Sequence, residues 1–305
     1  MLNWYYDKTE LRNTPSASND ITYETELEYR REGICLIMDG GKKLKLGSNT
    51  IATSAIYFHR FYMFHSFVNF SQYTISCTCL FLASKIDETP RRLKDVINIY
   101  HGMLNTTQYM KFGSDPEQKV ITLESILLET LQFDFDVDHP YDFLPQFSQC
   151  FIAPQEEIDA VVKAAQDFTD DSLYTTIALQ WEPEIVAVAL LHLSAQLREL
   201  DVADWNGRSA QHENWWDLFV EDIMVELLDD IAHQVLDLYS LPISERLHLS
   251  NVPFSNGSHL EKLDTTGRDQ ITVQLLKPFI QFRKRLLEET AESVCQFRGR
   301  IRLCD

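Results

Sequence analysis

The hydrophobic pattern of this chain centres on the segment from Ser71 to Pro90, whose apolar residues do not keep to one helical stripe. A helix that is apolar nearly all round is buried on every side. We therefore expect Tyr73–Ile86 to be the central helix of a helical bundle, with Ser71 capping its start and Thr89-Pro90 stopping it. Its apolar positions are Ile75, Cys77, Cys79, Leu80, Phe81, Leu82, Ala83 and Ile86.

Four further helices are predicted around this segment from apolar residues at spacings of three and four. They cover Thr25–Lys45, Thr50–Phe67, Arg91–Leu104 and Lys119–Gln132. The residues expected to point inward from the last of them are Ile121, Leu123, Leu127, Leu128 and Leu131. An extended stretch, Asp134–Pro140, ends this unit, because a residue before proline avoids the helical region.

A second unit repeats the first about 110 residues later. The run CLFLAS at 79–84 is echoed by LLHLSA at 190–195. The elements of the second unit are expected to begin at Pro140-Tyr141 and to continue through Ile158–Leu173, Glu184–Leu197, a Trp-rich crossing at Trp205–Phe219, and Val225–Leu238. No alternating apolar and polar run of convincing length is present. The predicted fold class is all-α, with two tandem five-helix repeats, each built around a buried third helix.

The predicted organisation is an N-terminal arm at 1–22, a first repeat at 23–138, a second repeat at 139–240 and a C-terminal tail at 241–305 that is partly helical or disordered. The net charge is −19, yet the tail holds ten Lys/Arg against eight Asp/Glu. The acidity therefore belongs to the two repeats, which opposes binding to nucleic-acid phosphates and suits a partner with a basic surface.

The six cysteines, at 35, 77, 79, 150, 295 and 304, form no paired C-x-x-C pattern. We expect no zinc site and no other metal or cofactor, and we interpret the thiols as small core residues of a reducing compartment. The chain starts without a basic region followed by an apolar run, and its longest apolar stretch is too short to span a bilayer. No secretory signal and no membrane association are therefore expected.

Several residues together resemble the first box of the cyclin family. They are an apolar helix ending in Ala83-Ser84-Lys85, the acidic pair Asp87-Glu88, and Glu124 in a helix ending in Leu131-Gln132-Phe133-Asp134. The resemblance is to the transcription-associated branch of that family and covers roughly residues 4–240. The stretches that carry it include Trp4–Lys8, Tyr29–Gly33, Ile56–Phe67, Leu179–Ile185 and Trp215-Trp216.

This resemblance implies a protein without catalytic residues, not an enzyme itself. It implies a regulatory subunit in the nucleus that binds and activates a transcriptional cyclin-dependent kinase, which phosphorylates the C-terminal repeats of RNA polymerase II and promotes elongation. In cyclins the mobile αC helix of the kinase packs on the third and fifth helices of the first box. The positions that match are Lys85, Asp87, Glu88, Glu124, Leu128, Phe133 and Phe135. Lys85 and Glu124 are expected to pair.

The chemistry of these residue types agrees with that role. A lysine at a helix C-terminus is favourable for the helix dipole and can donate to carbonyl groups of a partner. Rigid aromatic residues such as Phe133 and Phe135 are typical anchors of interfaces. If the family resemblance is set aside, an internal ion pair between Lys85 and Glu124 among core aromatic residues explains the same pattern. Cell-cycle cyclins carry an apolar substrate-docking motif where this chain has Arg30–Cys35, so no such docking is expected.

Two other functions match parts of the sequence. Asp134-Phe135-Asp136-Val137 resembles the motif of aspartate-nucleophile phosphatases, whose first aspartate must end a buried parallel strand; the preceding residues here are helical. The second is a DNA-bound general transcription factor with twin cyclin-like repeats, which needs a basic face. The acidic repeats argue against it, and no direct DNA binding is expected.

In the tail, the basic residues Arg283-Lys284-Arg285, Arg298, Arg300 and Arg302 are interpreted as solvated charge rather than an RNA contact or import signal.

Overall fold

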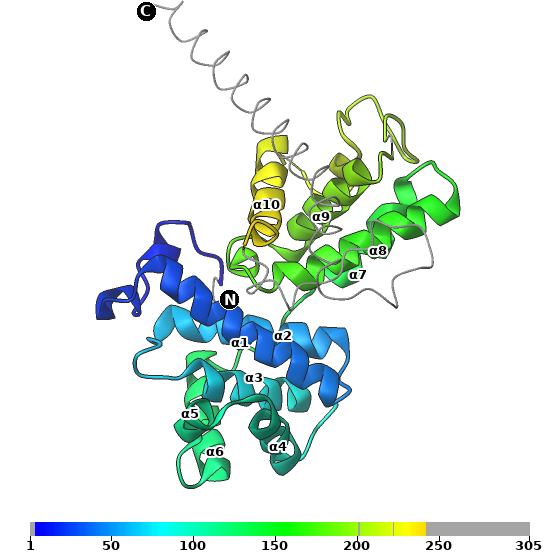
Figure 1. Ribbon diagram of the computed structural model, residues 1–305. Helices are drawn as coiled ribbons and strands as arrows, with labels where there is room; N and C mark the ends of the chain where they lie inside the picture. Colours follow the sequence, from blue (N-terminus) through cyan, green and yellow to red (C-terminus); the bar gives the residue numbers. More distant parts are fainter. Residues whose placement is uncertain (1–3, 201, 222, 242–305) are drawn as a thin grey trace, which may run out of the picture. The chain divides into compact units, whose positions relative to one another are not determined.

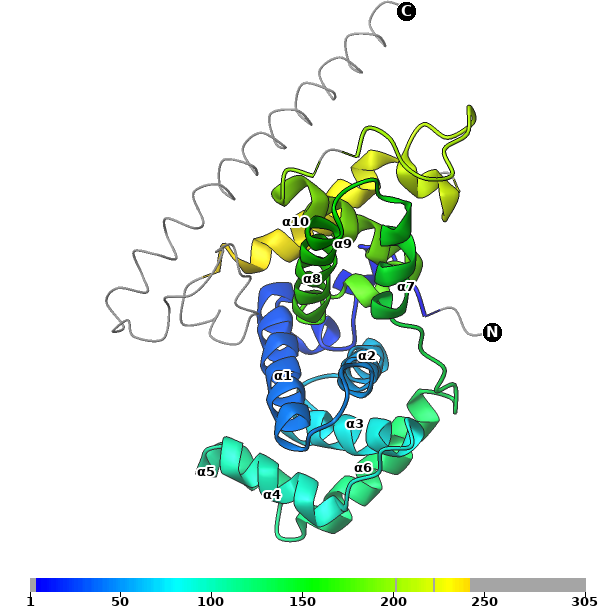
Figure 2. The same ribbon diagram turned by 90° about the vertical axis from the view of Figure 1, so that its right-hand side faces the viewer.

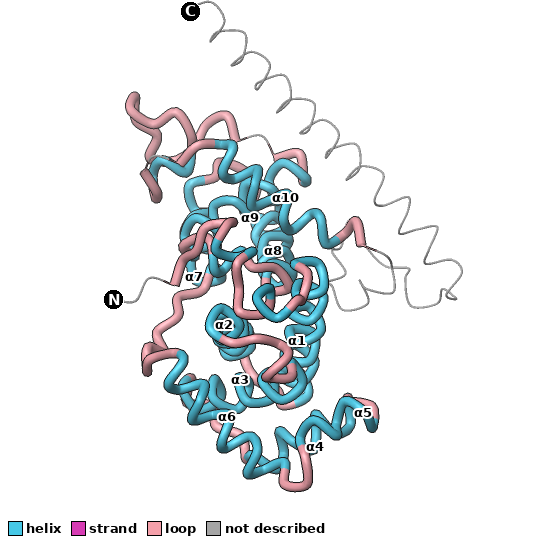
Figure 3. Tube along the Cα trace, turned by 90° about the vertical axis from the view of Figure 1, so that its left-hand side faces the viewer, coloured by secondary structure: helices cyan, strands magenta, loops and turns pink. Residues whose placement is uncertain are grey.

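The computed structural model describes residues 4–200, 202–221 and 223–241, which fold into helices joined by loops and turns (Figures 1 and 3). Over these ranges there is no β-strand, so the all-α prediction is confirmed. None of the helices in the described ranges has the length and apolarity needed to cross a membrane. The predicted tail, beyond Leu241, lies outside the described residues.

The first repeat has α3 at its centre. Its helices are α1 (Tyr23–Lys43), α2 (Ser48–Phe64), α3 (Gln72–Ile86), α4 (Leu93–Met103), the short α5 (Thr106–Tyr109) and α6 (Pro116–Thr130). Helix α3 packs against α1, α2, α4 and α6 (Figure 2). Even its hydroxyl-bearing residues Ser76 and Thr78 are fully buried. The prediction of a central, buried helix is confirmed.

The second helix ends earlier than the apolar pattern predicts. Helix α2 stops at Phe64, because His65 adopts an extended conformation. The chain then turns and places the Phe67 ring flat on Tyr62, with ring centroids 3.5 Å apart and an interplanar angle of 6°. Phe67 therefore joins the core from a loop, where helical spacing had placed it inside the helix.

The capping residues of α3 and α6 differ from each other. Ser71 occupies the N-cap position of α3 as predicted, but its hydroxyl makes no capping hydrogen bond. Helix α6 begins at Pro116, three residues before the predicted start. There the Asp115 side chain accepts from the Gln118 backbone N–H at 3.0 Å, and proline fits the first turn of a helix.

The second repeat is built in the same way around α9. Its elements are α7 (Pro140–Phe147), α8 (Gln155–Ser172), α9 (Pro183–Leu197), a 3₁₀ helix at Trp215–Leu218 and α10 (Val225–Leu238). Helix α9 packs against α7, α8 and α10. The Trp-rich crossing is a loop whose helical part is that 3₁₀ turn, in which Trp215 and Trp216 are buried.

The two central helices also end alike, 111 residues apart. The backbone turns into the left-handed region at Glu88 (φ 54°) after α3 and at Glu199 (φ 55°) after α9. After each, a backbone N–H returns to the last turn of the helix: Thr89 to the Ser84 carbonyl, and Leu200 to the Ala195 carbonyl, both at 2.9 Å. This six-residue return is a Schellman cap, which satisfies carbonyls that a helix end leaves open. The repeat offset read from the sequence is thus confirmed.

A buried polar network joins the repeats. The Arg30 guanidinium is 2% exposed, pairs with Glu26 at 2.7 Å and lies 3.3 Å from Nδ1 of His59. Because arginine can only donate, Nδ1 accepts and His59 Nε2–H donates to the Leu173 carbonyl of the second repeat at 2.9 Å. Burial, with the nearby Arg30 charge, lowers the pKa of His59 to about 3, so this link is made by a neutral imidazole.

The N-terminal arm also contacts both repeats. Trp4 is buried, and its indole N–H donates to Asp134 at 3.1 Å in the stretch after α6. The Tyr6 backbone N–H donates to the Leu179 carbonyl of the second repeat at 2.8 Å. The aromatic residues at the start of the chain therefore pack onto the helical body.

Candidate functional site

Lys85, in the last turn of α3, forms an ion pair with Glu124 of α6. The lysine side chain is 40% exposed and the glutamate side chain 13%. The Lys85 ammonium also lies 4.4 Å from the centre of the Phe81 ring, one turn earlier on α3, in cation–π geometry. The predicted pairing is therefore present, with Glu124 largely buried and Lys85 still open to solvent on one side.

The left-handed cap of α3 brings two more carboxylates to the same helix end. Asp87 is half-buried and Glu88 is exposed. They lie two and three residues after Lys85, at the carbonyl end of the α3 dipole, where a cation is favoured. The end of α3 therefore presents one lysine flanked by acidic groups, a pattern suited to a partner that offers both carbonyl acceptors and N–H donors.

Helix α6 ends in a way that exposes an aromatic side chain. Gln132 and Phe133 both have positive φ, at 51° and 60°. The Phe133 N–H donates back to the Leu128 carbonyl at 3.1 Å. The Phe133 side chain is 65% exposed. Residues held in sparsely populated backbone conformations cluster at binding sites, so this exposed ring is a candidate contact for a partner.

Phe135 anchors this exposed ring to the core. Its ring meets Phe133 edge-on at 6.1 Å and Tyr57 of α2 at 6.4 Å. The Tyr57 hydroxyl donates to the Phe135 carbonyl at 2.8 Å. Phe135 is therefore half-buried and held by Tyr57, while Phe133 is exposed to solvent.

One residue of this surface was assigned wrongly and another was missed. Ile121 was predicted to point inward, but it is 45% exposed on α6, and its neighbour Val120 fills the core instead. Phe81 was counted as part of the apolar helix, although its contact with Lys85 places it at the site. Its spacing of four residues before Lys85 was the available signal.

Other chemistry suggested by the sequence finds no support in the described part of the chain. Asp134–Val137 follows helix α6 and not a strand, and Asp134 accepts a hydrogen bond from the Trp4 indole. An aspartate nucleophile at the end of a parallel strand is therefore excluded there. Among the described residues, no group of three or more His, Cys, Asp or Glu side chains is placed to hold a metal ion.

The family model for the cyclin N-terminal domain matches residues 1–136. The first repeat of the chain is therefore a cyclin N-terminal domain. It is 47% identical to cyclin-K of Danio rerio over 237 residues and 46% identical to cyclin-K of Homo sapiens over the same length. These matches cover 78% of this chain, but 55% and 41% of the two relatives. The chain thus spans about half the length of the curated relatives that it matches.

A solved structure supports the fold. A chain of the yeast RNA Pol II CTD kinase CTDK-1 complex superposes with a TM-score of 0.61 at 17% identity, covering 88% of this protein and 87% of that chain. At this identity the likeness concerns the fold, which includes both repeats.

Proposed function

We propose that this cyclin is the regulatory subunit of a transcriptional cyclin-dependent kinase, and that it promotes phosphorylation of the C-terminal repeats of RNA polymerase II in the nucleus. The observation that carries the proposal is the Lys85–Glu124 pair, together with the exposed side chains of Ile121 on α6 and of Phe133 just after it. The similarity to cyclin-K supports the transcriptional class.

The geometry supports binding of a partner helix across the ends of α3 and α6. Phe133 and Ile121 offer the exposed apolar anchors, and Leu128 and Phe135 support them as half-buried residues. Lys85 has donor capacity left for a carbonyl of the partner, while Glu124 holds the ammonium in place. Asp87 and Glu88 form a charged rim, which contributes orientation and association rate more than affinity.

Activation would follow from positioning alone. In protein kinases a glutamate of the αC helix must pair with the active-site lysine before phosphoryl transfer can proceed. A cyclin surface that packs against αC holds that pairing in place, and it needs no catalytic residue of its own.

The test is to purify the tagged full chain from nuclear extract and to identify the associated kinase by mass spectrometry. The complex should phosphorylate a peptide of RNA polymerase II C-terminal repeats, and the kinase without the cyclin should be nearly inactive. Recovery of the chain without any kinase, or with a kinase whose activity the chain does not raise, would refute the proposal.

A further inference from the structure

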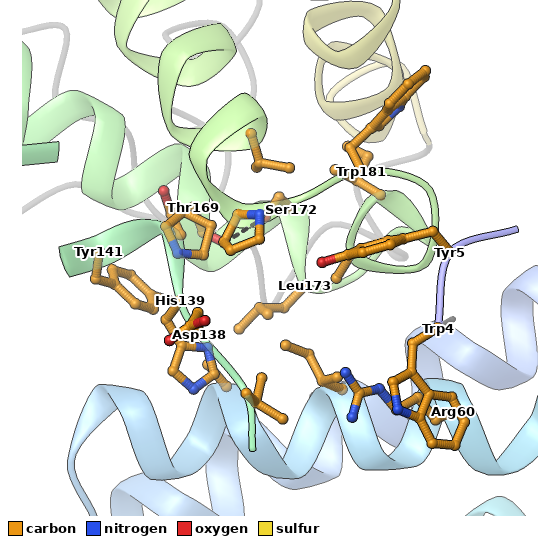
Figure 4. Close-up of a pocket in the computed structure, with 18 of the residues that line it drawn as sticks. Trp4, Tyr5, Arg60, Asp138, His139, Tyr141, Thr169, Ser172, Leu173 and Trp181 are labelled. Carbon is orange, nitrogen blue, oxygen red and sulfur yellow. Dashed lines mark hydrogen bonds between the residues drawn. The ribbon is translucent and has the colours of Figure 1, made fainter. Parts of the chain in front are cut away.

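A cavity of about 310 Å³ lies between α2, the stretch after α6, and the second repeat, with the N-terminal arm along one side (Figure 4). Its volume lies at the lower end of the range found for ligand sites in proteins. The cavity is distinct from the Lys85–Glu124 pair, because neither of those residues lines it. The cyclin–kinase interaction proposed above leaves this cavity without a role.

Arg60 of α2 supplies the first reason to expect a ligand. Its side chain is 9% exposed, and its Nε and Nη1 atoms are buried without a hydrogen-bond partner. The guanidinium stacks on the Trp4 ring at 4.6 Å and points into the space below Tyr5 (Figure 4). Buried charged donors without acceptors are costly. A ligand that brings acceptor oxygens to Arg60 would remove that cost.

The charges around Arg60 decide which kind of acceptor fits. Asp134, Asp136 and Asp138 all line the cavity, and Arg60 is the one Lys or Arg among its lining residues. The lining is therefore net negative, which disfavours a free anion such as a phosphate or a carboxylate. Neutral carbonyl oxygens satisfy the guanidinium without bringing a negative charge toward the three carboxylates.

The remaining walls favour an apolar group. Tyr5, Tyr141, Trp181, Pro140 and Pro183 contribute aromatic rings and proline rings to the lining. Walls of this kind accept apolar or proline side chains of extended peptides, whose main-chain carbonyls stay available for donors. Asp136 and Asp138 are exposed, so they can meet cationic side chains on either flank of such a peptide.

We propose that this cavity binds an extended, basic segment of a further partner protein. An apolar or proline side chain fills the cavity, main-chain carbonyls accept from Arg60, and flanking Lys or Arg residues lie against Asp136 and Asp138. Because the cavity is formed by this chain alone, binding requires no kinase, and a failure of the kinase proposal leaves this one standing.

The experiment selects short random peptides, displayed on phage, against the full chain without kinase, and measures the dissociation constants of the recovered peptides by fluorescence anisotropy. Ala178→Met fills the cavity from a half-exposed position and should weaken binding by about tenfold or more. Asp136→Asn with Asp138→Asn should weaken it about threefold to tenfold, and less so at high salt. Glu156→Gln with Glu157→Gln, the same charge change on exposed residues of α8, should leave it unchanged.

Recovered peptides rich in Lys or Arg next to apolar or proline residues would support the proposal. Acidic peptides, or no peptide that binds better than its scrambled version, would overturn it. Equal affinity for the Ala178→Met variant, at an unchanged melting temperature, would overturn it as well. If that variant does not fold, the two aspartate substitutions and their α8 control decide the outcome.

Discussion

Helices α3 and α9 occupy corresponding places in the two repeats, and each is packed on nearly every side. Leu80 and Leu191, 111 residues apart, are both fully buried. Both helices also end in the same left-handed cap, at Glu88 and Glu199. Along their length the two helices serve the same purpose, which is to fill the centre of a repeat.

The last turns of the two helices differ. In α3, Phe81 and Lys85 form a cation–π contact at 4.4 Å, and Lys85 pairs with Glu124. The corresponding residues of α9, 111 positions later, are His192 and Gln196, whose side-chain nitrogens lie 2.9 Å apart. The second repeat thus places a neutral hydrogen bond where the first has a cation held by an aromatic ring and a carboxylate.

The neighbouring helices differ at the matching place. The buried positions Val120, Leu123 and Leu127 of α6 correspond to Leu228, Ile231 and Val235 of α10, each 108 residues later. At that spacing Glu124 corresponds to Ala232, which is buried. Burial of the central helix therefore builds each repeat, whereas a lysine in its last turn that pairs with a carboxylate of the neighbouring helix is found in the first repeat and not at the corresponding described residues of the second.

The substitutions Leu80→Ala and Leu191→Ala test the buried centres that α3 and α9 have in common. Each removes a fully buried side chain, which costs about 2–5 kcal/mol in the free energy of unfolding. Urea denaturation followed by circular dichroism measures both. A loss below about 1 kcal/mol for either variant would contradict the central place of that helix in its repeat.

The difference between the two ends is tested by Lys85→Ala combined with Glu124→Ala. Loss of both charges should weaken kinase binding about 10- to 100-fold while leaving the helical fold intact, because the pair faces solvent on one side. Biolayer interferometry with the co-purified kinase measures the affinity.

The matched control for that double variant is Gln196→Ala, at the corresponding place of the second repeat. It should leave kinase binding unchanged. Equal loss from both variants would mean that the first repeat is not the distinct binding surface, and undiminished co-precipitation of the kinase with the double variant would remove the role of the Lys85–Glu124 pair.

The sequence predicts the common part of the repeats better than their differences. Residues 73–86 are apolar on nearly all faces of a helix, so any exposed face would leave apolar surface in water. The sequence therefore predicts burial, and the structure confirms it. Ile121 was placed inward because helical spacing does not separate it from Val120, one position away. The positive φ of Gln132 and Phe133, which exposes the Phe133 ring, has no signal in residue type, since glycine usually takes such positions. Arg30 reads as a surface charge, yet it lies in the core, because Glu26 and the His59 region supply its acceptors.

His192, near the end of α9, predicts how the free energy of unfolding depends on pH. Burial lowers the pKa of His192 from 6.5 to about 4, so the unfolded chain binds the proton first. Stability should therefore be level above about pH 7 and should fall as the pH drops toward 4, by about 2 kcal/mol between about pH 7 and pH 5. His192→Phe, which copies Phe81, should remove this part of the acid sensitivity in urea titrations at the two pH values. His59 titrates in both proteins, so the difference between them isolates His192, and identical slopes would contradict the assignment.

The smallest effect is expected at the two caps. Glu88→Gly and Glu199→Gly each place glycine at positive φ, which removes the strain of a side chain there but adds freedom to the unfolded chain. Each should raise the free energy of unfolding by about 0.5 kcal/mol. Glu88→Gln and Glu199→Gln keep a side chain and should leave stability unchanged.

Glu88→Gln should nevertheless slow association with the kinase about twofold to threefold, because it removes a rim charge at the α3 end, whereas Glu199→Gln should not. Equal association rates for the two Gln variants would place Glu88 outside the kinase-binding surface, and the difference between the repeats would then rest on Lys85 and Glu124 alone.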